Sequence, residues 1–306
     1  MSVAMTTSLA DPHDDRLHDA YRAVAEQVQR FDKDRWLAGL YAPEERRDHL
    51  YALYAFSGEI GRIRDVVSDP LPGEIRARWW ADTLEGRRGE EGAGHPVAAA
   101  LLDTVGRFRL PVEDAVRLVE ARIFDLYDDP MPDLAALETY CDDTSATLIR
   151  LAARVLADGH DPGIDEVSRH AGRAYGLTLV LRSLPHDAAR GQVFLPADLM
   201  ARHGVGRDDV VSGRAVPGLS AVLADLRART RDELAATRRL IRTIPPEVAP
   251  AFLPVSLVEM CLDRMDRAGY DPFRTPVESP QWRRQLRLWR AARRARKAAK
   301  RLWHQV

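Results

Sequence analysis

Cysteine is nearly absent from this 306-residue chain, which contains Cys141 and Cys261 alone. The two lie far apart and match no spacing of metal ligands, so we predict two buried thiols in a reducing compartment. Long apolar runs are also missing. The best candidate, PAFLPVSLVEMCL (250–262), is interrupted by proline and glutamate and is shorter than the roughly 20 residues that cross a bilayer. The N-terminus has no basic segment followed by an apolar one, which argues against a secretory signal. These absences predict a cytoplasmic protein.

Acidic residues are absent from residues 281–306, which hold ten Lys or Arg, whereas residues 1–280 carry a net charge of −11. Within this basic tail Trp282, Leu286 and Trp289 recur at helical spacing, so we predict a basic amphipathic helix over 281–306. Such a helix can dock on an anionic membrane surface, which would place the protein peripherally on the inner face of a membrane, or on an acidic partner. The alternative is a terminal helix packed by its apolar stripe. No nucleic-acid partner is expected, because the rest of the chain is acidic.

Strand-like alternation and hairpin signals are lacking too, and apolar residues recur at helical intervals along nearly the whole chain. We therefore predict an all-α protein of about ten helices. An N-terminal segment and first helix are expected over residues 1–30, a helical domain over 31–280 and the basic helix over 281–306. Two long helices are expected within the domain, over 216–243 and 246–268.

Two polar pairs interrupt apolar helices about 120 residues apart. Gly61 and Asp65 are separated by four positions, and so are Ser183 and Asp187, so the members of each pair should share a helix face. Pro185 lies inside the second pair and should end or kink the helix, which would turn Asp187 away from Asp65.

The stretches around these pairs carry a family resemblance. YAFSGEIGRIRD (54–65) is similar to the pattern YAFCRxxDDxxD of the squalene/phytoene synthase family, and LTLVLRSLPHDAARGQVFLP (177–196) is similar to its LTNxLRDxxEDxxxGRxYLP. The resemblance extends over about 31–288. It implies a single-domain helical bundle of the isoprenoid synthase type around a central cavity. In that family, two facing clusters of aspartates hold Mg²⁺ ions that bridge to a substrate diphosphate.

The chain departs from both patterns at the acidic positions. The resemblance implies a degenerate metal and diphosphate site, in which Asp65 and Asp187 remain where the family has more acids. The residues at the site positions are Gly61, Arg62, Asp65, Ser183, His186 and Asp187. Arg62 would be the most disruptive change, because a cation about 6 Å from a divalent ion is repelled by roughly 5 kcal/mol at an effective dielectric near 20.

Other residues at family positions also differ. Leu179 replaces the asparagine, Gln192 the arginine and Phe194 the tyrosine of the second pattern. No catalytic residue is assigned and no cofactor is expected. If the protein is active, Mg²⁺ on Asp65 and Asp187 is expected.

Arginines near the two motifs suggest a metal-free alternative, because guanidinium groups suit phosphates. The candidate anion-binding residues are Arg62, Arg64, Arg182 and Arg190. Each remaining acid also has a simpler explanation: Asp65 as a salt-bridged helix residue and Asp187 as a turn residue that accepts bonds from backbone amides.

A denser acidic cluster, FDLYDDPMPD (124–133), contains Asp125, Asp128 and Asp129 but adjoins two prolines and lies outside the family's ligand motifs. We interpret it as a solvated loop. The pair Asp142 and Asp143 is interpreted in the same way.

Within the family, the chain most resembles the phytoene-synthase-like assembly factors of respiratory complex I and their bacterial relatives. The resemblance is carried by LRSLPHDAARGQVFLPADL, ETYCDDTSATLIRL, and PAFLPVSLVEMCLDRMD followed by GYDPF. It implies a non-catalytic assembly or lipid-binding factor, with complex I subunits or assembly intermediates as partners. One alternative is an active, Mg²⁺-dependent head-to-head prenyltransferase. A third hypothesis is a pocket that holds an isoprenoid or another lipid without reaction.

Overall fold

The computed structural model describes residues 12–303, with side chains over 15–297, and that part contains helices and no strand. The all-α prediction is confirmed. Both cysteines are free and buried, as expected. Residues 1–11 and 304–306, which belong to the predicted terminal segments, lie outside the described residues. Within the described range, no helix has the length and apolar character that a membrane span requires.

Nine α-helices in the described part have ten or more residues, in keeping with the predicted number. They are α1 (Pro12–Phe31), α3 (Glu44–Gly61), α4 (Pro70–Leu84), α6 (Pro96–Phe108), α7 (Val112–Ala121), α9 (Thr147–Leu156), α10 (Asp165–Ala189), α13 (Pro217–Leu240) and α16 (Gln281–Trp303). The shorter α-helices are α2 (Lys33–Gly39), α5 (Gly89–Gly94), α8 (Leu134–Cys141), α11 (Ala197–Arg202), α12 (Arg207–Val211), α14 (Ala249–Phe252) and α15 (Val258–Met265).

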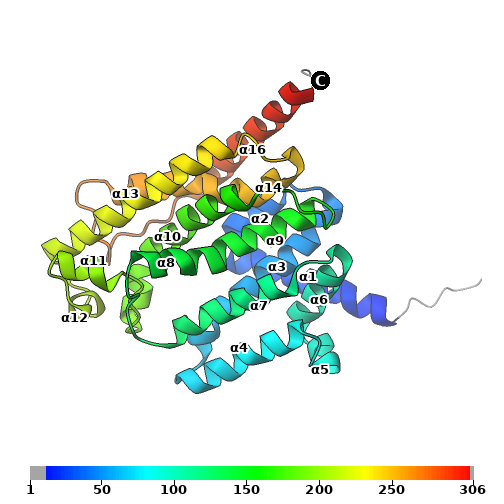
Figure 1. Ribbon diagram of the computed structural model, residues 1–306, viewed down its shortest axis with the longest axis horizontal. Helices are drawn as coiled ribbons and strands as arrows, with labels where there is room; N and C mark the ends of the chain where they lie inside the picture. Colours follow the sequence, from blue (N-terminus) through cyan, green and yellow to red (C-terminus); the bar gives the residue numbers. More distant parts are fainter. Residues whose placement is uncertain (1–11, 304–306) are drawn as a thin grey trace, which may run out of the picture.

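Helices α3 and α10 lie at the centre of the bundle (Figure 1). Every residue from 49 to 57 of α3 is buried, because α1, α6 and α9 pack around it. Helix α10 packs lengthwise against α13 and also contacts α8, α9 and α15. A helix that is apolar on several faces is stable when neighbours cover it on all sides, and these two helices therefore provide a rigid frame for the polar residues that they carry.

Prolines break the last part of the domain into short pieces. The predicted helix over 216–243 is confirmed as α13, but the regular helix predicted over 246–268 is wrong. That segment alternates between 3₁₀ and α geometry as η4 (Pro246–Val248), α14, η5 (Leu253–Leu257) and α15. Pro250 and Pro254 lack the amide hydrogen that a continuous helix needs, and their rings clash with the carbonyl four residues earlier.

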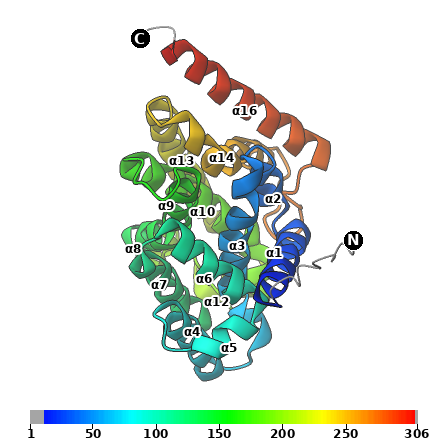
Figure 2. The same ribbon diagram turned by 90° about the vertical axis from the view of Figure 1, so that its right-hand side faces the viewer.

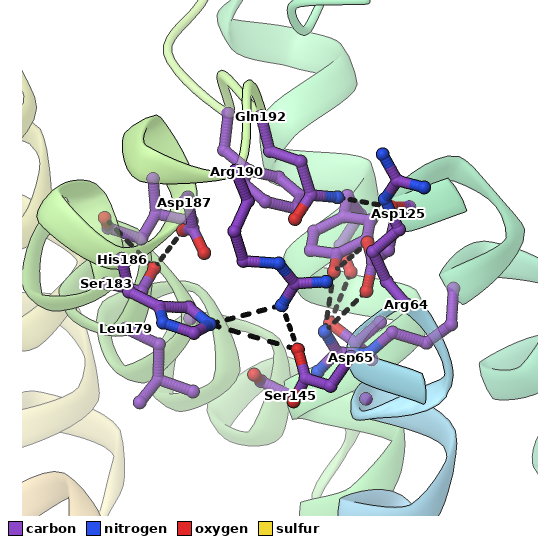
Figure 3. A pocket seen from close by; sticks show the side chains of 17 residues that line it. Arg64, Asp65, Asp125, Ser145, Leu179, Ser183, His186, Asp187, Arg190 and Gln192 are labelled. Atoms are coloured by element: carbon purple, nitrogen blue, oxygen red, sulfur yellow. Dashed lines mark hydrogen bonds and ion pairs between the residues drawn. The ribbon is translucent and has the colours of Figure 1, made fainter. Parts of the chain in front are cut away.

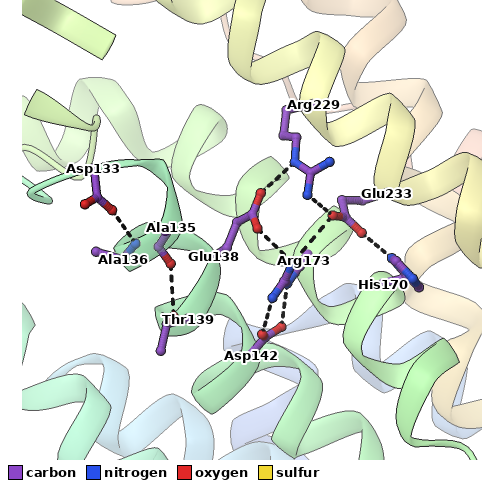
Figure 4. Close-up of polar contacts among 10 residues, drawn as sticks. All are labelled: Asp133, Ala135, Ala136, Glu138, Thr139, Asp142, His170, Arg173, Arg229 and Glu233. Carbon is purple, nitrogen blue, oxygen red and sulfur yellow. Dashed lines mark hydrogen bonds and ion pairs between the residues drawn. The ribbon is translucent and has the colours of Figure 1, made fainter. Parts of the chain in front are cut away.

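A partly buried ionic network joins α8, α10 and α13 (Figure 4). Arg173 of α10 donates to both oxygens of Asp142, at 2.8 and 2.6 Å, and to Glu138 at 2.7 Å. Glu233 of α13, 2% exposed, lies 2.5 Å from Nη2 of Arg229. Asp142 is therefore not part of a solvated loop, as we had predicted. It begins the π-helical turn η3 (Asp142–Ala146) and is paired there with Arg173 of α10.

Gly172 marks the closest approach of α10 to η3, because a Cβ atom there would collide with the backbone of Ala146. We expect Gly172→Ala to lower the free energy of unfolding by about 1–3 kcal/mol through overpacking. The matched control is Gly58→Ala on α3, where a Cβ would meet nothing within 4 Å. That change should be neutral or stabilising by up to about 1 kcal/mol, because alanine has the higher helix propensity. Urea unfolding of both variants measures the difference, and equal effects would contradict the close contact.

Candidate functional site

A pocket of about 240 Å³ lies between the end of α3, the second half of α10, and two 3₁₀ turns, η1 (Ile63–Val66) and η2 (Arg122–Leu126) (Figure 3). Residues of both family-like stretches line it. Among the residues at the site positions, Gly61, Asp65, Ser183, His186 and Asp187 face this one space. The volume is below the roughly 300–1,000 Å³ that is typical of pockets for small molecules of drug size.

The first stretch changes helical geometry inside the motif. Helix α3 ends at Gly61, and the backbone amide of Asp65 bonds the carbonyl of Arg62 at 2.9 Å, three residues back. Gly61 and Asp65 therefore do not share one α-helical face, as we had predicted, because the chain tightens into a 3₁₀ turn between them. Asp65 still reaches the pocket, carried by η1.

The second stretch stays helical through its proline. Helix α10 continues past Pro185 to Ala189, and Leu184 and Ala188 on this turn are buried against the bundle. Packing of these residues offsets the backbone bond that the proline removes. The expectation that Pro185 would turn Asp187 away from Asp65 is therefore wrong, since both carboxylates line the same pocket.

The Asp65 carboxylate is paired across the pocket. Its Oδ1 accepts from Nη1 of Arg190, which lies at the C-terminal end of α10, and it is 3.8 Å from Nε2 of His186 (Figure 3). Asp65 is thus a salt-bridged residue, as one of our interpretations proposed, but its partner comes from the facing helix and not from the neighbouring arginines.

Asp187 has a different environment, because its partner is neutral. The hydroxyl of Ser183, one turn earlier, donates to its carboxylate, and the residue is 9% exposed. Burial raises the pKa of Asp187 to about 6, although the Ser183 hydroxyl and nearby His186 oppose the shift. Asp187 accepts a side-chain bond within a helix, so the simpler explanation as a turn residue does not describe it.

The pocket also contains an acid that we had predicted to be solvated. Asp125 on η2 is 6% exposed, lines the pocket, and accepts from Nη1 of Arg122 at 3.0 Å and from the hydroxyl of Tyr140 at 2.7 Å. Arg122 also donates to the Tyr140 hydroxyl at 2.7 Å. The three-residue spacing of Arg122 and Asp125 could have suggested a helical ion pair. No sequence signal pointed to Tyr140.

The guanidinium of Arg122 lies beside the position where the family pattern has its first aspartate. A Cβ atom on Gly61 would be 3.7–3.9 Å from its atoms. The cation beside the Gly61 position is therefore Arg122, which comes from a turn 61 residues further along the chain.

Arg62 and Arg182, expected among the anion-binding residues, lie outside the pocket. The guanidinium of Arg62 stacks on Phe31 at 4.1 Å from the ring centroid and lies 3.6 Å from Glu59. Arg182 points toward Asp34 of α2, at 3.5 Å. These positions correct the expectation that Arg62 stands beside a metal position. Arg64 and Arg190 do line the pocket, and Arg64 pairs with Asp128 at 3.1 Å.

A second cavity of about 10 Å³ lies against Tyr54 and Tyr175. The guanidinium of Arg35 lies over both rings, at 5.6 and 5.0 Å from their centroids. A space of this size holds about one water molecule, so it offers no room for a long apolar chain.

The acids of the pocket, as they are disposed, do not fit a magnesium cluster. Mg²⁺ requires oxygen ligands in octahedral order, but Asp65 and Asp125 are bonded to guanidinium groups and Asp187 to a hydroxyl. Throughout the part of the chain that the structure describes, no three His, Cys, Asp or Glu side chains gather into a possible metal site. The same holds for a diphosphate, since the arginines that could bind it already have acidic partners.

Comparison with known proteins agrees with the fold and the motif positions. The family model described as squalene/phytoene synthase matches residues 28–290. The chain therefore belongs to the squalene/phytoene synthase family. The crystal structure of a dehydrosqualene synthase in complex with ligand superposes with a TM-score of 0.79 at 19% identity, covering 94% of this chain and all of that one, which supports the same fold.

Relatives with assigned names are of two kinds. The human protein named NADH dehydrogenase (ubiquinone) complex I, assembly factor 6 is 28% identical over 253 residues, which cover 83% of this chain and 76% of that protein. The phytoene synthase of Thermus thermophilus is 29% identical over 267 residues, which cover 84% of this chain and 86% of that protein. Membership of the family therefore does not distinguish an assembly factor from a synthase, and the residues of the site have to be considered.

The raised pKa of Asp187 predicts a pH-dependent effect on stability. Between its ordinary pKa of 3.8 and about 6, the folded protein binds a proton that the unfolded chain has lost, so this group's contribution to stability decreases as the pH rises through that range. Asp187→Asn should therefore raise the free energy of unfolding more at pH 7.5 than at pH 4. The difference between the two effects should be at most about 3 kcal/mol. Urea unfolding at both pH values measures this, and an equal effect at both would contradict the burial of an ionisable group.

Ser183→Ala provides the companion test. Loss of the hydroxyl that stabilises the charged carboxylate should raise the pKa of Asp187 further, which a carboxyl-resolved NMR titration can follow. A lower pKa in this variant would show that Ser183 does not donate to Asp187.

Proposed function

We propose that this protein is a non-catalytic member of its family that serves as an assembly or binding factor for respiratory complex I. The observation that carries the proposal is the pairing of the pocket's acids. Asp65 and Asp125 are bonded to arginines and Asp187 to a serine, so the pocket offers no free set of carboxylates for Mg²⁺. Without such ions, the departure of diphosphate from a prenyl chain has no electrophilic assistance.

Similarity to complex I assembly factor 6 over most of both chains supports the direction of this proposal. The limited space supports it as well, because a pocket of about 240 Å³ is small for two prenyl chains. Complex I subunits or assembly intermediates are the partners that this function implies.

Turnover of prenyl diphosphates tests the catalytic half of the proposal. The purified protein, incubated with farnesyl or geranylgeranyl diphosphate, should form no product above the enzyme-free blank, either with Mg²⁺ or with a chelator. The phytoene synthase of Thermus thermophilus provides the positive control in the same assay. Mg²⁺-dependent product from the wild-type chain would overturn this half.

Deletion of the gene in its native host tests the assembly half. The amount of assembled complex I should fall, as measured by native gel electrophoresis and NADH oxidation in membranes, and re-expression of the chain should restore it. Normal complex I in the deletion strain would count against an assembly role even if the protein proved inactive as a synthase.

An active prenyltransferase is the alternative, and one observation favours it. Asp65 and Asp187 line the same pocket from opposite sides, as the metal-binding acids of the family pattern would. Under this alternative Mg²⁺ would displace Arg190 from Asp65 and Ser183 from Asp187. Product formation should then be abolished by Asp65→Ala.

A pocket that holds a lipid without reaction is compatible with the assembly role. Arg64 and Arg190 line the pocket, and under this hypothesis an anionic head group would displace Asp128 and Asp65 from them. Native mass spectrometry of the purified protein should then show a co-purifying isoprenoid or lipid, and its mass would identify the class.

A further inference from the structure

Helix α16 lies at one end of the molecule, on the far side from α4 and α5 (Figures 1 and 2). One face of it is packed. Leu288 is fully buried and Ala292 is 7% exposed, in a small cluster with Leu37 and Leu253 among its members. Arg284 on this face donates to Asp34 at 3.0 Å. This face of α16 is therefore already occupied by contacts with the bundle.

A second apolar stripe faces away from the bundle. Trp282, Leu286 and Trp289 are 60%, 36% and 47% exposed. At about 100° per residue these three lie within roughly 60° of one another and between about 100° and 160° from Leu288. The stripe is thus separate from the packed face, and within the described part of the chain no other helix covers it.

Basic side chains surround this stripe. The exposed cations of the described helix are Arg283, Arg290, Arg293, Arg294, Arg296 and Lys297. Arg283 and Arg293 lie over the rings of Trp282 and Trp289, at 5.1 and 5.3 Å from the centroids. Residues 281–306 contain no acid at all. An apolar stripe with a positive border and no negative charge is complementary to an apolar surface with a negative border.

We propose that α16 docks the protein on a membrane that contains anionic phospholipids, with Trp282, Leu286 and Trp289 at the level of the head groups. Tryptophan favours this region because its ring is apolar while its N–H remains hydrated. A row of arginines along a convex helix can meet mobile lipid phosphates without a matched geometry, whereas a protein partner would need a complementary groove. This inference goes beyond the proposed function and holds whether or not the pocket is catalytic.

Vesicle binding by the full chain tests the proposal. The protein should co-sediment at 50 mM salt with vesicles of phosphatidylcholine and phosphatidylglycerol in a 7:3 ratio, and not with vesicles of phosphatidylcholine alone. Brominated lipid should quench its tryptophan fluorescence. Trp282→Ala combined with Trp289→Ala should weaken binding at least tenfold and remove most of the quenching. Arg283→Gln and Arg290→Gln should each weaken binding about fivefold, as expected for one basic residue near an anionic surface.

Leu71→Ala combined with Ile75→Ala is the matched control, because these α4 residues are 66% and 62% exposed at the other end of the molecule. This variant should bind vesicles as the wild type does. Circular dichroism verifies that every variant is folded. Failure of the folded wild type to bind anionic vesicles would overturn the proposal and leave an acidic protein surface as the occupant. Binding that depends on the α4 residues and not on the α16 residues would overturn it too.

Discussion

The groups that compensate the carboxylates of the pocket determine what the pocket of this protein can do. Arg190 holds Asp65 from the facing helix, and Arg122 with Tyr140 holds Asp125. At the motif position Asp65, the charge that the family pattern would place beside a metal ion is paired here with a side chain of the chain itself. Asp65 and Asp125 are therefore each compensated by an arginine of the chain.

The fold can stay the same while the chemistry of the site changes, because the two depend on different residues. The bundle is built from buried apolar positions along α3 and α10 and their neighbours, and these positions are compatible with many site chemistries. The 3₁₀ turn η1 and the proline-containing end of α10 then carry a few polar groups into one small space. A scaffold of the synthase type can in this way persist while the groups at its centre change.

The family-like stretches showed from the sequence that residues near 61–65 and 183–187 should meet, and both do line one pocket. The directions of individual side chains were harder to predict. Arg62 was expected to face the metal position, but the end of α3 turns it onto Phe31. Pro185 was expected to turn Asp187 away, but the buried neighbours of that turn keep α10 helical. Asp125 was assigned to solvent because prolines follow it, although the residue itself lies inside the bundle.

Helical periodicity, the spacing of the motif residues and the uneven charge of the C-terminal segment are local properties, so the sequence by itself determined the all-helical class, the family and the position of the candidate site. The pairing of the site's charges depends on contacts between residues that are far apart in the chain, such as Asp65 with Arg190. Such contacts follow from how helices pack, and a pattern within one segment carries no information about them. Only the tertiary structure decided which cation stands next to each acid, and which face of α16 remains uncovered.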